Sequence, residues 1–498
     1  MISKNAERLI KERYANKNES PEDVFKRVAK AISMRDDKFE KWLYNSMAEG
    51  VFFPNSPCIK NAGKKKGMLH ACFTLPLSDS VQSIFETLTN MAVIFQKGGG
   101  CGVNFSALRP KNASLSGGGT SSGALSFMGV YDATIQTVKQ GGWRRGACMG
   151  ILDYDHPEIL DFCRAKIGGR LQNFNLSVLV TNEFMEKASK GGSVDLIHED
   201  KKYGTMKAKD ILDLVSLGSY VCGDPALLFF DRINKDNRLY PETKLKITNP
   251  CSEVSLPEYG ACCLGSVNLS KFVEGNNFNF DKFYEAVRMV SRALLNMNAI
   301  SFYPLPQITR VMHELNPIGV GLMGFSDTLI MLGIKYDSEE ALNFIDQISK
   351  PYIKGTDEVA PDSFYNRIIA PTGSLSILAD CSHSIEPIYA RSYERHVVAG
   401  VFKERKDIYD SEFCRTALEI NPEWHLKIQA KFQTIVNGGI SKTINLPNEA
   451  SVDDIKKIYI SAWKMGVKGV TVFREGSIDG VLVNTENKGT KCDDVCHL

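Results

Sequence analysis

The sequence has no apolar run that could cross a membrane, and its beginning lacks the apolar stretch of a secretory signal. A membrane-spanning helix needs about 18 or more consecutive apolar residues, and a signal peptide carries a continuous apolar segment behind a basic start. The first twenty residues instead carry charges throughout. We therefore expect a cytoplasmic protein that makes no membrane contact.

The sequence also lacks an excess of either charge. It has 60 basic and 58 acidic residues, which gives a formal net charge of +2. Proteins that bind nucleic acid broadly through its phosphates usually carry a strongly basic surface. The balanced charge therefore argues against nucleic acid as a partner.

A disulfide framework is not expected either. The chain has 13 cysteines, an odd number spread over 498 residues, whereas such frameworks are typical of short secreted domains. In a reducing compartment most cysteines behave as small apolar core residues. Each thiol therefore needs its own argument for a chemical role.

The chain is long enough, at 498 residues and 43% hydrophobic content, to bury a large core. Short apolar runs at 176–180 and 318–323 have the length of strands, and they alternate with helical patterns such as 338–348. This alternation indicates an α/β fold with parallel strands. We expect three parts, namely a helical segment at 1–50, one α/β domain at 51–475 and a flexible polar tail at 476–498.

A glycine run at 98–102 invites a phosphate-loop interpretation. Before it, apolar residues recur at helical spacing up to Lys97, and after it residues 103–105 have a strand pattern. A dinucleotide-binding fingerprint needs the opposite order, with a strand, then glycines and then a helix. The run therefore does not predict a dinucleotide site.

The most reactive stretch is 249–253, with the sequence Asn-Pro-Cys-Ser-Glu. Its proline biases the preceding residue toward extended geometry, and an extended backbone points alternate side chains to one face. We therefore expect the amide of Asn249, the thiol of Cys251 and the carboxylate of Glu253 to converge. The further thiols that we expect at the same pocket are Cys72 and Cys262.

A second loop follows the apolar residues 368–370. Glycine and hydroxyl residues after a buried strand can aim backbone N–H groups and hydroxyls at an anion. Such residues are also common in turns for structural reasons alone, so both interpretations stay open. The loop consists of Pro371, Thr372, Gly373, Ser374, Leu375 and Ser376.

The end of the chain carries Cys492, Cys496 and His497. Chain ends are poorly ordered unless they are tied down, so these thiols would sit on a mobile arm. A redox shuttle is one interpretation. A partial zinc site without a fourth ligand nearby and surface cysteines without a role are the others, and we expect no bound metal ion.

Taken together, these segments resemble the catalytic chain of ribonucleotide reductase, most closely the adenosylcobalamin-dependent class II type. The resemblance runs in order through nearly the whole chain, and this makes it specific. The segments are 53–57, 61–63, 71–76, 98–110, 139–147, 249–253, 262–269, 371–376, 384–387 and 466–470.

The resemblance implies a ten-stranded α/β barrel of two five-stranded parallel halves, with a central finger loop and a short helical N-terminal segment. Cys251 would be the thiyl radical that takes the 3′ hydrogen of the ribose, while Glu253 accepts the 3′-hydroxyl proton and Asn249 holds substrate hydroxyls. Cys72 and Cys262 would supply two electrons and a proton as the 2′-hydroxyl leaves as water. A dithiol can deliver both reducing equivalents by closing into a disulfide.

Cys263 leaves one of these assignments open. The family usually has asparagine at this position, and a shift of one residue would make Cys263 the redox partner of Cys72. The register of the surrounding segment favours Cys262.

The resemblance also implies where the substrate binds. The loop 371–376 would hold its phosphates, with Ser56 and the backbone of Ala71 near the ribose and base. Kinship with dimeric class II forms favours ribonucleoside diphosphates as substrates and a homodimer as the assembly. The tail thiols would re-reduce the buried disulfide and would themselves be reduced by thioredoxin or glutaredoxin.

Allosteric control is implied in the same way. Asp79 would hold the ribose of a specificity effector, a deoxynucleotide or ATP. Lys166 and Arg170 lie in the segment 164–173, which would pass the effector's identity to the substrate base. The short helical start leaves no room for the family's activity-control domain, so we expect dATP to act only as a specificity effector.

The radical source is inferred from an absence. Class I enzymes receive the radical through two adjacent tyrosines near the C-terminus, but the sequence has no Tyr-Tyr pair and the aligned residues are Val472 and Phe473. Phenylalanine has no phenol to couple proton and electron transfer. The resemblance therefore implies adenosylcobalamin. A small reductase with a separate metal-radical subunit and a non-catalytic nucleotide-binding regulator on the same scaffold are the alternatives.

Overall fold

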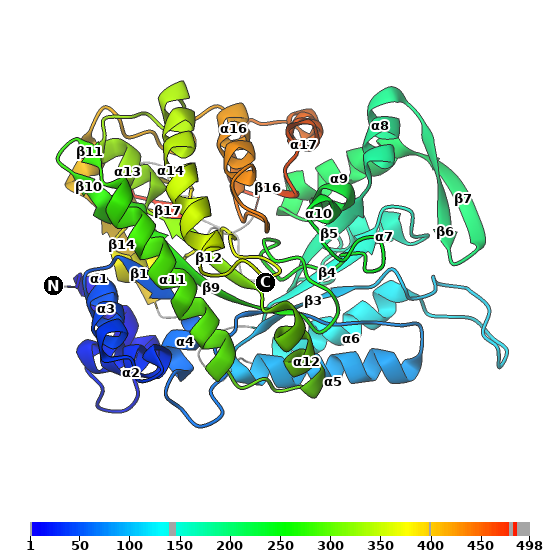
Figure 1. Ribbon diagram of the computed structural model, residues 1–498. Coiled ribbons are helices and arrows are strands. Elements are labelled where there is room, and N and C mark those ends of the chain that lie inside the picture. Colours follow the sequence, from blue (N-terminus) through cyan, green and yellow to red (C-terminus); the bar gives the residue numbers. More distant parts are fainter. Residues whose placement is uncertain (1, 139–145, 398–399, 478–481, 486–498) are drawn as a thin grey trace.

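The computed structural model describes residues 2–138, 146–397, 400–477 and 482–485 (Figure 1). Its helices are α1 (Lys4–Leu9), η1 (Ile10–Tyr14), α2 (Pro21–Ser33), α3 (Asp37–Ala48), α4 (Ser56–Asn61), α5 (Val81–Lys97), α6 (Ala124–Thr137), α7 (Ile159–Arg164), α8 (Asn182–Lys190), α9 (Ala208–Cys222), α10 (Phe230–Lys235), η2 (Leu269–Phe272), α11 (Phe280–Ile300), α12 (Pro306–Leu315), α13 (Phe325–Met331), α14 (Glu339–Asp357), α15 (Leu375–Ala379), η3 (Asp407–Asp410), α16 (Pro422–Gln433) and α17 (Val452–Met465). Its strands are β1 (Phe52–Pro54), β2 (Cys72–Thr74), β3 (Gly100–Asn104), β4 (Cys148–Asp153), β5 (Phe174–Val180), β6 (Ser193–His198), β7 (Lys201–Lys207), β8 (Ala226–Phe229), β9 (Ala261–Asn268), β10 (Val273–Glu274), β11 (Asn277–Phe278), β12 (Ile318–Met323), β13 (Ser392–Val397), β14 (Gly400–Arg405), β15 (Thr443–Leu446), β16 (Gly469–Arg474) and β17 (Leu482–Asn484).

A ten-stranded mixed sheet runs through the centre of the molecule (Figure 1). Its strand order is β1-β9-β2-β3-β4-β5-β8-β16-β15, and β12 pairs with β9. The neighbours β2, β3, β4, β5 and β8 are all parallel, while β9 and β16 join the two ends of this block in antiparallel fashion. The predicted α/β class is confirmed, and the sheet has the predicted number of strands.

Parallel pairing continues beyond both ends of this block. Strand β12 is parallel to β9, and β15 is parallel to β16. Single parallel bridges join Val320 of β12 to Arg367, and Ile369 to Ile440. The apolar run 368–370 is therefore extended chain between β12 and the segment before β15, although it forms isolated bridges and no regular strand.

Local sequence signals account for the ends of α2 and α5, and α5 ends at Lys97 as predicted. Helix α2 follows the N-cap Ser20, whose hydroxyl and the carboxylate of Asp23 form a reciprocal capping box. Helix α5 follows the N-cap Ser80 and ends before Gly98, whose φ of +98° lies in the region that favours glycine. These caps fix the ends of helices that cover the sheet.

Apolar side chains are buried on both faces of the sheet. One cluster packs α2, α3, α11 and α14 against β9 and β12, and a second packs α5, α6, α9 and α17 against β3, β4 and β5. A smaller third cluster contains Cys262 and Leu264 of β9, whereas Cys263 and Val267 of the same strand belong to the first cluster. Alternate residues of β9 therefore face two different apolar layers.

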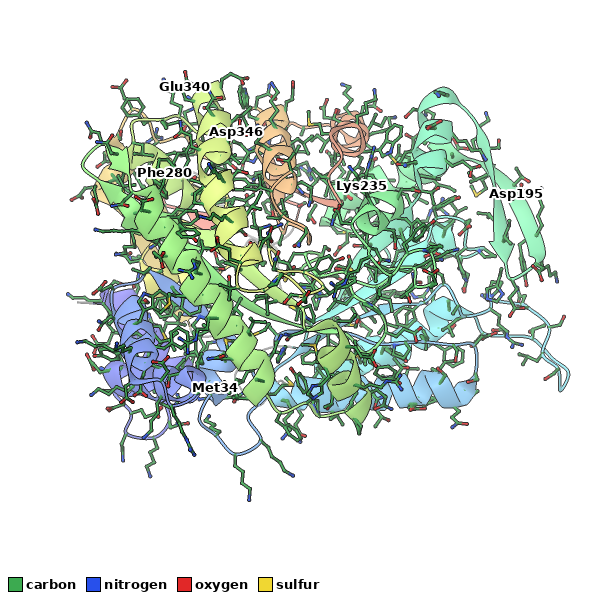
Figure 2. The ribbon with its side chains drawn as sticks, in the orientation of Figure 1. Met34, Asp195, Lys235, Phe280, Glu340 and Asp346 are labelled. Atoms are coloured by element: carbon green, nitrogen blue, oxygen red, sulfur yellow. The ribbon has the colours of Figure 1, made fainter. Side chains whose placement is uncertain are left out.

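Three small sheets lie outside the ten-stranded sheet in the described part of the chain, and one of them is the β10–β11 pair. The β6–β7 hairpin projects from the molecule, and Asp195 on it points outward (Figure 2). Strands β14, β13 and β17 form a three-stranded sheet. Within the described ranges, every helix falls short of the combined length and apolar character that a bilayer crossing requires.

Candidate active site

A hairpin loop between Lys246 and Leu256 carries three of the predicted catalytic residues. Its arms are joined by an antiparallel bridge between Thr248 and Ser255. At the tip the Asn249 N–H donates to the Val254 carbonyl at 3.0 Å, and the Asn249 Oδ1 accepts the Val254 N–H at 2.9 Å. The tip is therefore a closed turn held by both the backbone and the side chain of Asn249.

The extended backbone predicted for 249–253 is wrong. The Ser252 N–H donates to the Asn249 carbonyl at 3.0 Å, and Ser252 has a φ of +70°. An asparagine side chain that bonds to nearby backbone favours a turn over a strand, and this outweighs the extended bias that Pro250 imposes. The reactive groups still come together, but they do so through the turn and through contact with Cys72.

Glycines of β3 make room for this loop. A Cβ at Gly102 would lie 1.7 Å from the carbonyl oxygen of Thr248, and one at Gly100 would lie 2.9 Å from Cγ of Pro250. Glycine in a strand interior is typical where another backbone approaches closely. Strand β3 begins at Gly100, earlier than the predicted 103–105, so part of the glycine run belongs to the strand and has a packing role.

Two further contacts fix the loop from the side. The Asn175 Nδ2 at the start of β5 donates to the Pro250 carbonyl at 2.7 Å. The Gly439 N–H donates to the Glu253 carbonyl at 2.8 Å, and a Cβ at Gly439 would lie 2.7 Å from the same oxygen. The turn is thus clamped between β5 and the segment that leads into β15.

Cys72 of β2 and Cys262 of β9 are directly opposite residues of an antiparallel pair. Opposite residues have Cα atoms about 4.5–5.5 Å apart, which lies within the roughly 4.4–6.8 Å that a disulfide spans. The Asn249 Nδ2 donates to the Cys72 Sγ at 3.0 Å. The structure therefore brings the two thiols and the turn to one pocket, as predicted.

Burial keeps both thiols protonated at neutral pH. Cys72 is 6% exposed and Cys262 is fully buried. Burial raises the pKa of each thiol well above its usual value, because charge is costly away from water. The Glu253 carboxylate raises both pKa values further, and Cys251 also raises that of Cys72. Glu253 therefore lies within electrostatic reach of both thiols, and Cys251 within reach of Cys72.

Cys263 faces away from this pocket. Its side chain belongs to the first apolar cluster, which also contains Cys58, and the Asn55 Nδ2 lies 3.9 Å from its Sγ. Neighbouring residues in a strand point to opposite faces. Cys262 is therefore the residue whose thiol lies on the same face as that of Cys72, which agrees with the predicted register.

Cys251 is partly exposed and lines a cavity of about 420 Å³. The cavity is also lined by Val472 and Phe473 of β16, by Asp224 before β8 and by Lys442. Its volume lies within the roughly 300–1,000 Å³ of pockets that hold small ligands and cofactors. A molecule bound there would lie beside the Cys251 thiol.

The loop 371–376 has an open side and a buried side. Gly373 and Ser374 are partly exposed, whereas the side chains of Thr372, Leu375 and Ser376 are buried. A Cβ at Gly373 would meet no atom within 4 Å. The space directly beside Gly373 is therefore open.

Two arginines that the sequence analysis missed contact this loop. Arg395 of β13 donates from Nη1 to the Gly373 carbonyl at 2.6 Å and to the Ser376 Oγ at 3.1 Å. Arg13 of η1 donates from Nη1 to the Ser374 Oγ at 2.7 Å. No local pattern could connect these distant arginines to the loop, because only the tertiary fold brings them together.

The other two predicted substrate residues, Ala71 and Ser56, contact segments that are distant in the sequence. The Ala71 carbonyl, just before Cys72, accepts the Gly100 N–H at 2.7 Å. Ser56 begins α4, and its Oγ lies 2.8 Å from the Tyr14 hydroxyl. Both residues are therefore held in place by segments that are distant in the sequence.

The predicted effector residues have different surroundings. Asp79 forms an ion pair of 2.5 Å with Arg109, which the sequence analysis missed, and lines a cleft of about 1060 Å³. Lys166 forms an ion pair with Asp224, which lines the cavity beside Cys251. Arg170 donates to the Leu125 carbonyl at 3.5 Å. The effector roles therefore stay predictions, as do those of Cys492 and Cys496, which lie outside the described residues.

Comparison with known protein families gives two matches. The model for the ribonucleotide reductase barrel domain matches residues 70–354 and 403–473. The model for the ribonucleotide reductase all-alpha domain matches residues 1–67. Together the two models cover most of the chain, including the thiol pair and the 249–253 turn.

Curated relatives carry the same kind of name. The vitamin B12-dependent ribonucleoside-diphosphate reductase of Thermoplasma acidophilum is 39% identical over 86% of this chain and 64% of its own length. That of Mycobacterium tuberculosis is 34% identical over 96% of this chain and 79% of its own length. The ribonucleoside-diphosphate reductase large subunit of variola virus is 25% identical over 94% and 70%. The chain thus spans less than two thirds of the Thermoplasma protein.

Proposed function

The chain belongs to the ribonucleotide reductase family, and from this premise we propose that it reduces ribonucleoside diphosphates to 2′-deoxyribonucleotides. The observation that carries the proposal is that Cys72 and Cys262 lie opposite each other and that the 249–253 turn contacts Cys72 through Asn249, with Glu253 and Cys251 close enough to raise the pKa of Cys72. A buried thiol pair next to a third thiol, a carboxylate and an amide supplies the groups that removal of a ribose hydroxyl requires.

Each group has a defined step in this proposal. As a thiyl radical, Cys251 takes the 3′ hydrogen atom of the ribose, and Glu253 accepts the proton of the 3′-hydroxyl. The 2′-hydroxyl leaves as water with a proton from the thiol pair of Cys72 and Cys262, whose raised pKa values keep that proton in place. The two thiols give two electrons and close into a disulfide, and Cys251 returns the hydrogen atom to the 3′ carbon.

We propose adenosylcobalamin as the cofactor, because the relatives from Thermoplasma acidophilum and Mycobacterium tuberculosis are named vitamin B12-dependent. The cavity of about 420 Å³ beside Cys251 would receive only the reactive adenosyl part of this large cofactor. Bound there, the cofactor would supply the radical that Cys251 carries. Val472 and Phe473 would form one wall around it and Asp224 another. A separate radical-bearing subunit is less favoured, because neither Val472 nor Phe473 has the phenol that a tyrosine route needs.

The sheet is proposed to close into a barrel of two five-stranded parallel halves. The first half is the parallel block β2, β3, β4, β5 and β8. The second would consist of β9, β12, the extended chain at 367–369, β15 and β16, which the isolated bridges support. The hairpin with Cys251 would be the finger loop inside. We keep the division into 1–50, 51–475 and 476–498 as part of this proposal.

The substrate would bind with its phosphates at the loop 371–376 and its ribose near Ser56, Ala71 and Asn249. The open space beside Gly373 supports this placement. The proposal has two further parts. Effector nucleotides would bind at Asp79, and the tail would pass electrons from thioredoxin or glutaredoxin through Cys492 and Cys496.

A homodimer is proposed from an exposed apolar surface. Val81 and Phe85, one turn apart on α5, are 67% and 46% exposed, and Val130 on the neighbouring helix α6 is 41% exposed. Large apolar side chains gathered on adjacent helices are typical of a surface that another chain covers. A second copy of this chain would bury them.

An activity assay tests the proposal. It combines the purified chain with a ribonucleoside diphosphate, an effector nucleotide and a dithiol, and it is run with and without adenosylcobalamin. We expect deoxynucleotide only in the presence of the cofactor. Activity that instead requires a second protein subunit would contradict the cofactor assignment, and a complete absence of product under both conditions would contradict the function.

A further inference from the structure

Two consecutive residues of one helical turn reach two predicted substrate residues. Arg13 and Tyr14 end the π-helical turn η1, and π turns occur frequently at functional sites. The Arg13 Nη1 donates to the Ser374 Oγ at 2.7 Å, and the Tyr14 hydroxyl lies 2.8 Å from the Ser56 Oγ. This turn therefore joins the loop 371–376 to the start of α4.

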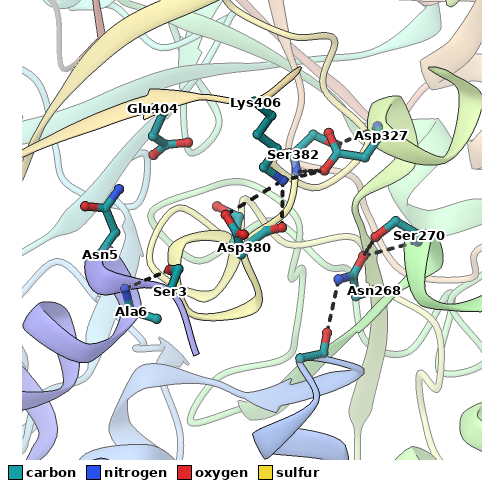
Figure 3. Close-up of polar contacts among 12 residues, drawn as sticks. Ser3, Asn5, Ala6, Asn268, Ser270, Asp327, Asp380, Ser382, Glu404 and Lys406 are labelled. Atoms are coloured by element: carbon teal, nitrogen blue, oxygen red, sulfur yellow. Dashed lines mark hydrogen bonds and ion pairs between the residues drawn. The ribbon is translucent and has the colours of Figure 1, made fainter. Parts of the chain in front are cut away.

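The turn is fixed relative to the loop by the helix before it. The Asn5 Nδ2 donates to the Lys403 carbonyl at 2.8 Å, and the Arg8 Nη1 donates to the Val401 carbonyl at 3.1 Å. Figure 3 shows Ser3 and Asn5 at the start of this helix, in the same region as Glu404 and Lys406. Helix α1 is therefore anchored on β14, and Arg13 has a defined position.

The loop itself is held from its other end. Lys406 forms an ion pair of 2.8 Å with Asp327 and donates to the Asp380 carbonyl at 2.6 Å (Figure 3). Asp380 directly follows α15, and the Ser382 N–H donates to the same Asp327 carboxylate at 3.1 Å. The helix after the loop is thereby tied to α13, so the hydroxyl of Ser374 is presented from a rigid support.

The two arginines at the loop have different settings. Arg395 is 1% exposed, contacts the loop from its buried side and forms an ion pair of 2.7 Å with Glu404. Its charge is therefore balanced within the protein, and it acts as a positioning residue for the loop. Arg13, at 8% exposure, contacts Ser374, which lies beside the open space at Gly373. Of the two guanidinium groups, that of Arg13 is the one next to where a ligand would bind.

We propose that Arg13 is a specificity-determining residue that binds the terminal phosphate of a nucleoside diphosphate at the loop 371–376. The inference rests on the proposed function, because it assumes that this loop faces the substrate phosphates. A guanidinium is always charged and presents a planar set of donors that matches phosphate oxygens. In its largely buried position, with Ser374 as a second donor beside it, Arg13 distinguishes a diphosphate from a monophosphate.

Equilibrium binding tests this without any turnover. Calorimetric titration of the chain with CDP, CMP and cytidine, in the absence of cobalamin, separates the contribution of each phosphate. For Arg13→Gln we expect the CDP affinity to fall roughly 10- to 100-fold, as for loss of a charged hydrogen bond. CMP affinity should fall less, and cytidine affinity should stay unchanged.

The matched control is Lys11→Gln. It also removes one positive charge, but from an exposed side chain two residues before Arg13 that pairs with Glu7. It should bind CDP like the unaltered chain. If Arg13→Gln does not fold, as judged by thermal unfolding, Arg13→Lys keeps the charge but loses the planar donors, and it should still weaken CDP more than CMP. Unchanged CDP affinity, or equal losses for CDP and CMP, would overturn the proposal. The titration measures binding and not reduction, so its result can be interpreted even if the chain shows no reductase activity.

Discussion

Cys72 and Cys262 lie directly opposite each other across the β2–β9 pair, with their side chains on one face of the sheet. Both are thiols in the structure. Their strand positions allow a disulfide to form without a backbone rearrangement. The pair can therefore give up two electrons while the pocket around it keeps its shape.

Replacing Cys262 by serine should abolish repeated turnover with a dithiol reductant, because the disulfide can no longer form. Replacing Cys263 by serine should leave turnover within about a factor of three, since its thiol faces the outer core and a buried change of this kind costs mainly stability. Steady-state deoxynucleotide formation checks both variants. The opposite pattern would show that Cys263 is the redox partner of Cys72.

Gly102→Ala should disable the hairpin loop. A Cβ there would lie 1.7 Å from the Thr248 carbonyl oxygen, so the loop must move, and a misplacement of this size can cost about 100-fold in kcat. Gly117→Ala is the matched control, because a Cβ at Gly117 meets no atom within 4 Å. Steady-state kinetics and thermal unfolding compare the two variants. Normal kcat in Gly102→Ala would refute the close packing of strand and loop.

Stability should fall as pH rises above the usual thiol pKa of 9.0. The folded-state pKa values of Cys72, Cys262 and Cys263 are all raised by burial, so the folded chain keeps protons that the unfolded chain releases. Their stabilising contribution is complete below that pH and is lost progressively above it. Urea unfolding at about pH 8 and about pH 10 measures the change. A free energy of unfolding that is equal or higher at the alkaline pH would argue against buried neutral thiols.

Phe85→Glu should convert a dimer into a monomer, because a charge placed in an apolar interface is costly to bury. Ile197→Glu is the control, since Ile197 is 41% exposed on the separate β6–β7 hairpin. Sedimentation velocity of both variants and the unaltered chain decides the question. A dimer that survives Phe85→Glu would place the interface elsewhere.

Local signals in the sequence predicted much of the fold. The helix that ends at Lys97 was predicted from apolar residues a few positions apart, and α5 does end there, because such spacing acts within one helix. The strand at 318–323 was also predicted correctly, because its length and apolar character do not depend on distant partners.

The geometry of the candidate site could not be predicted from local sequence signals. The segment 249–253 was predicted as extended and is a turn, because the Val254 N–H donates to the Asn249 Oδ1 only in the folded loop. The role of Gly102 depends on Thr248, which is remote in the sequence. The pairing of Cys72 with Cys262 was expected from family resemblance alone, since strand pairing over such a distance leaves no local pattern.

The central claim is that Cys251, Cys72 and Cys262 act together in one reduction. It is tested most directly by a single turnover of the pre-reduced chain with substrate, effector and adenosylcobalamin but no external dithiol, followed by peptide mass spectrometry. The account predicts one Cys72–Cys262 disulfide for each deoxynucleotide formed when the tail thiols Cys492 and Cys496 are replaced by serine, and neither product nor disulfide in Cys251→Ser. Deoxynucleotide formed without that disulfide, or formed by Cys251→Ser, would contradict it.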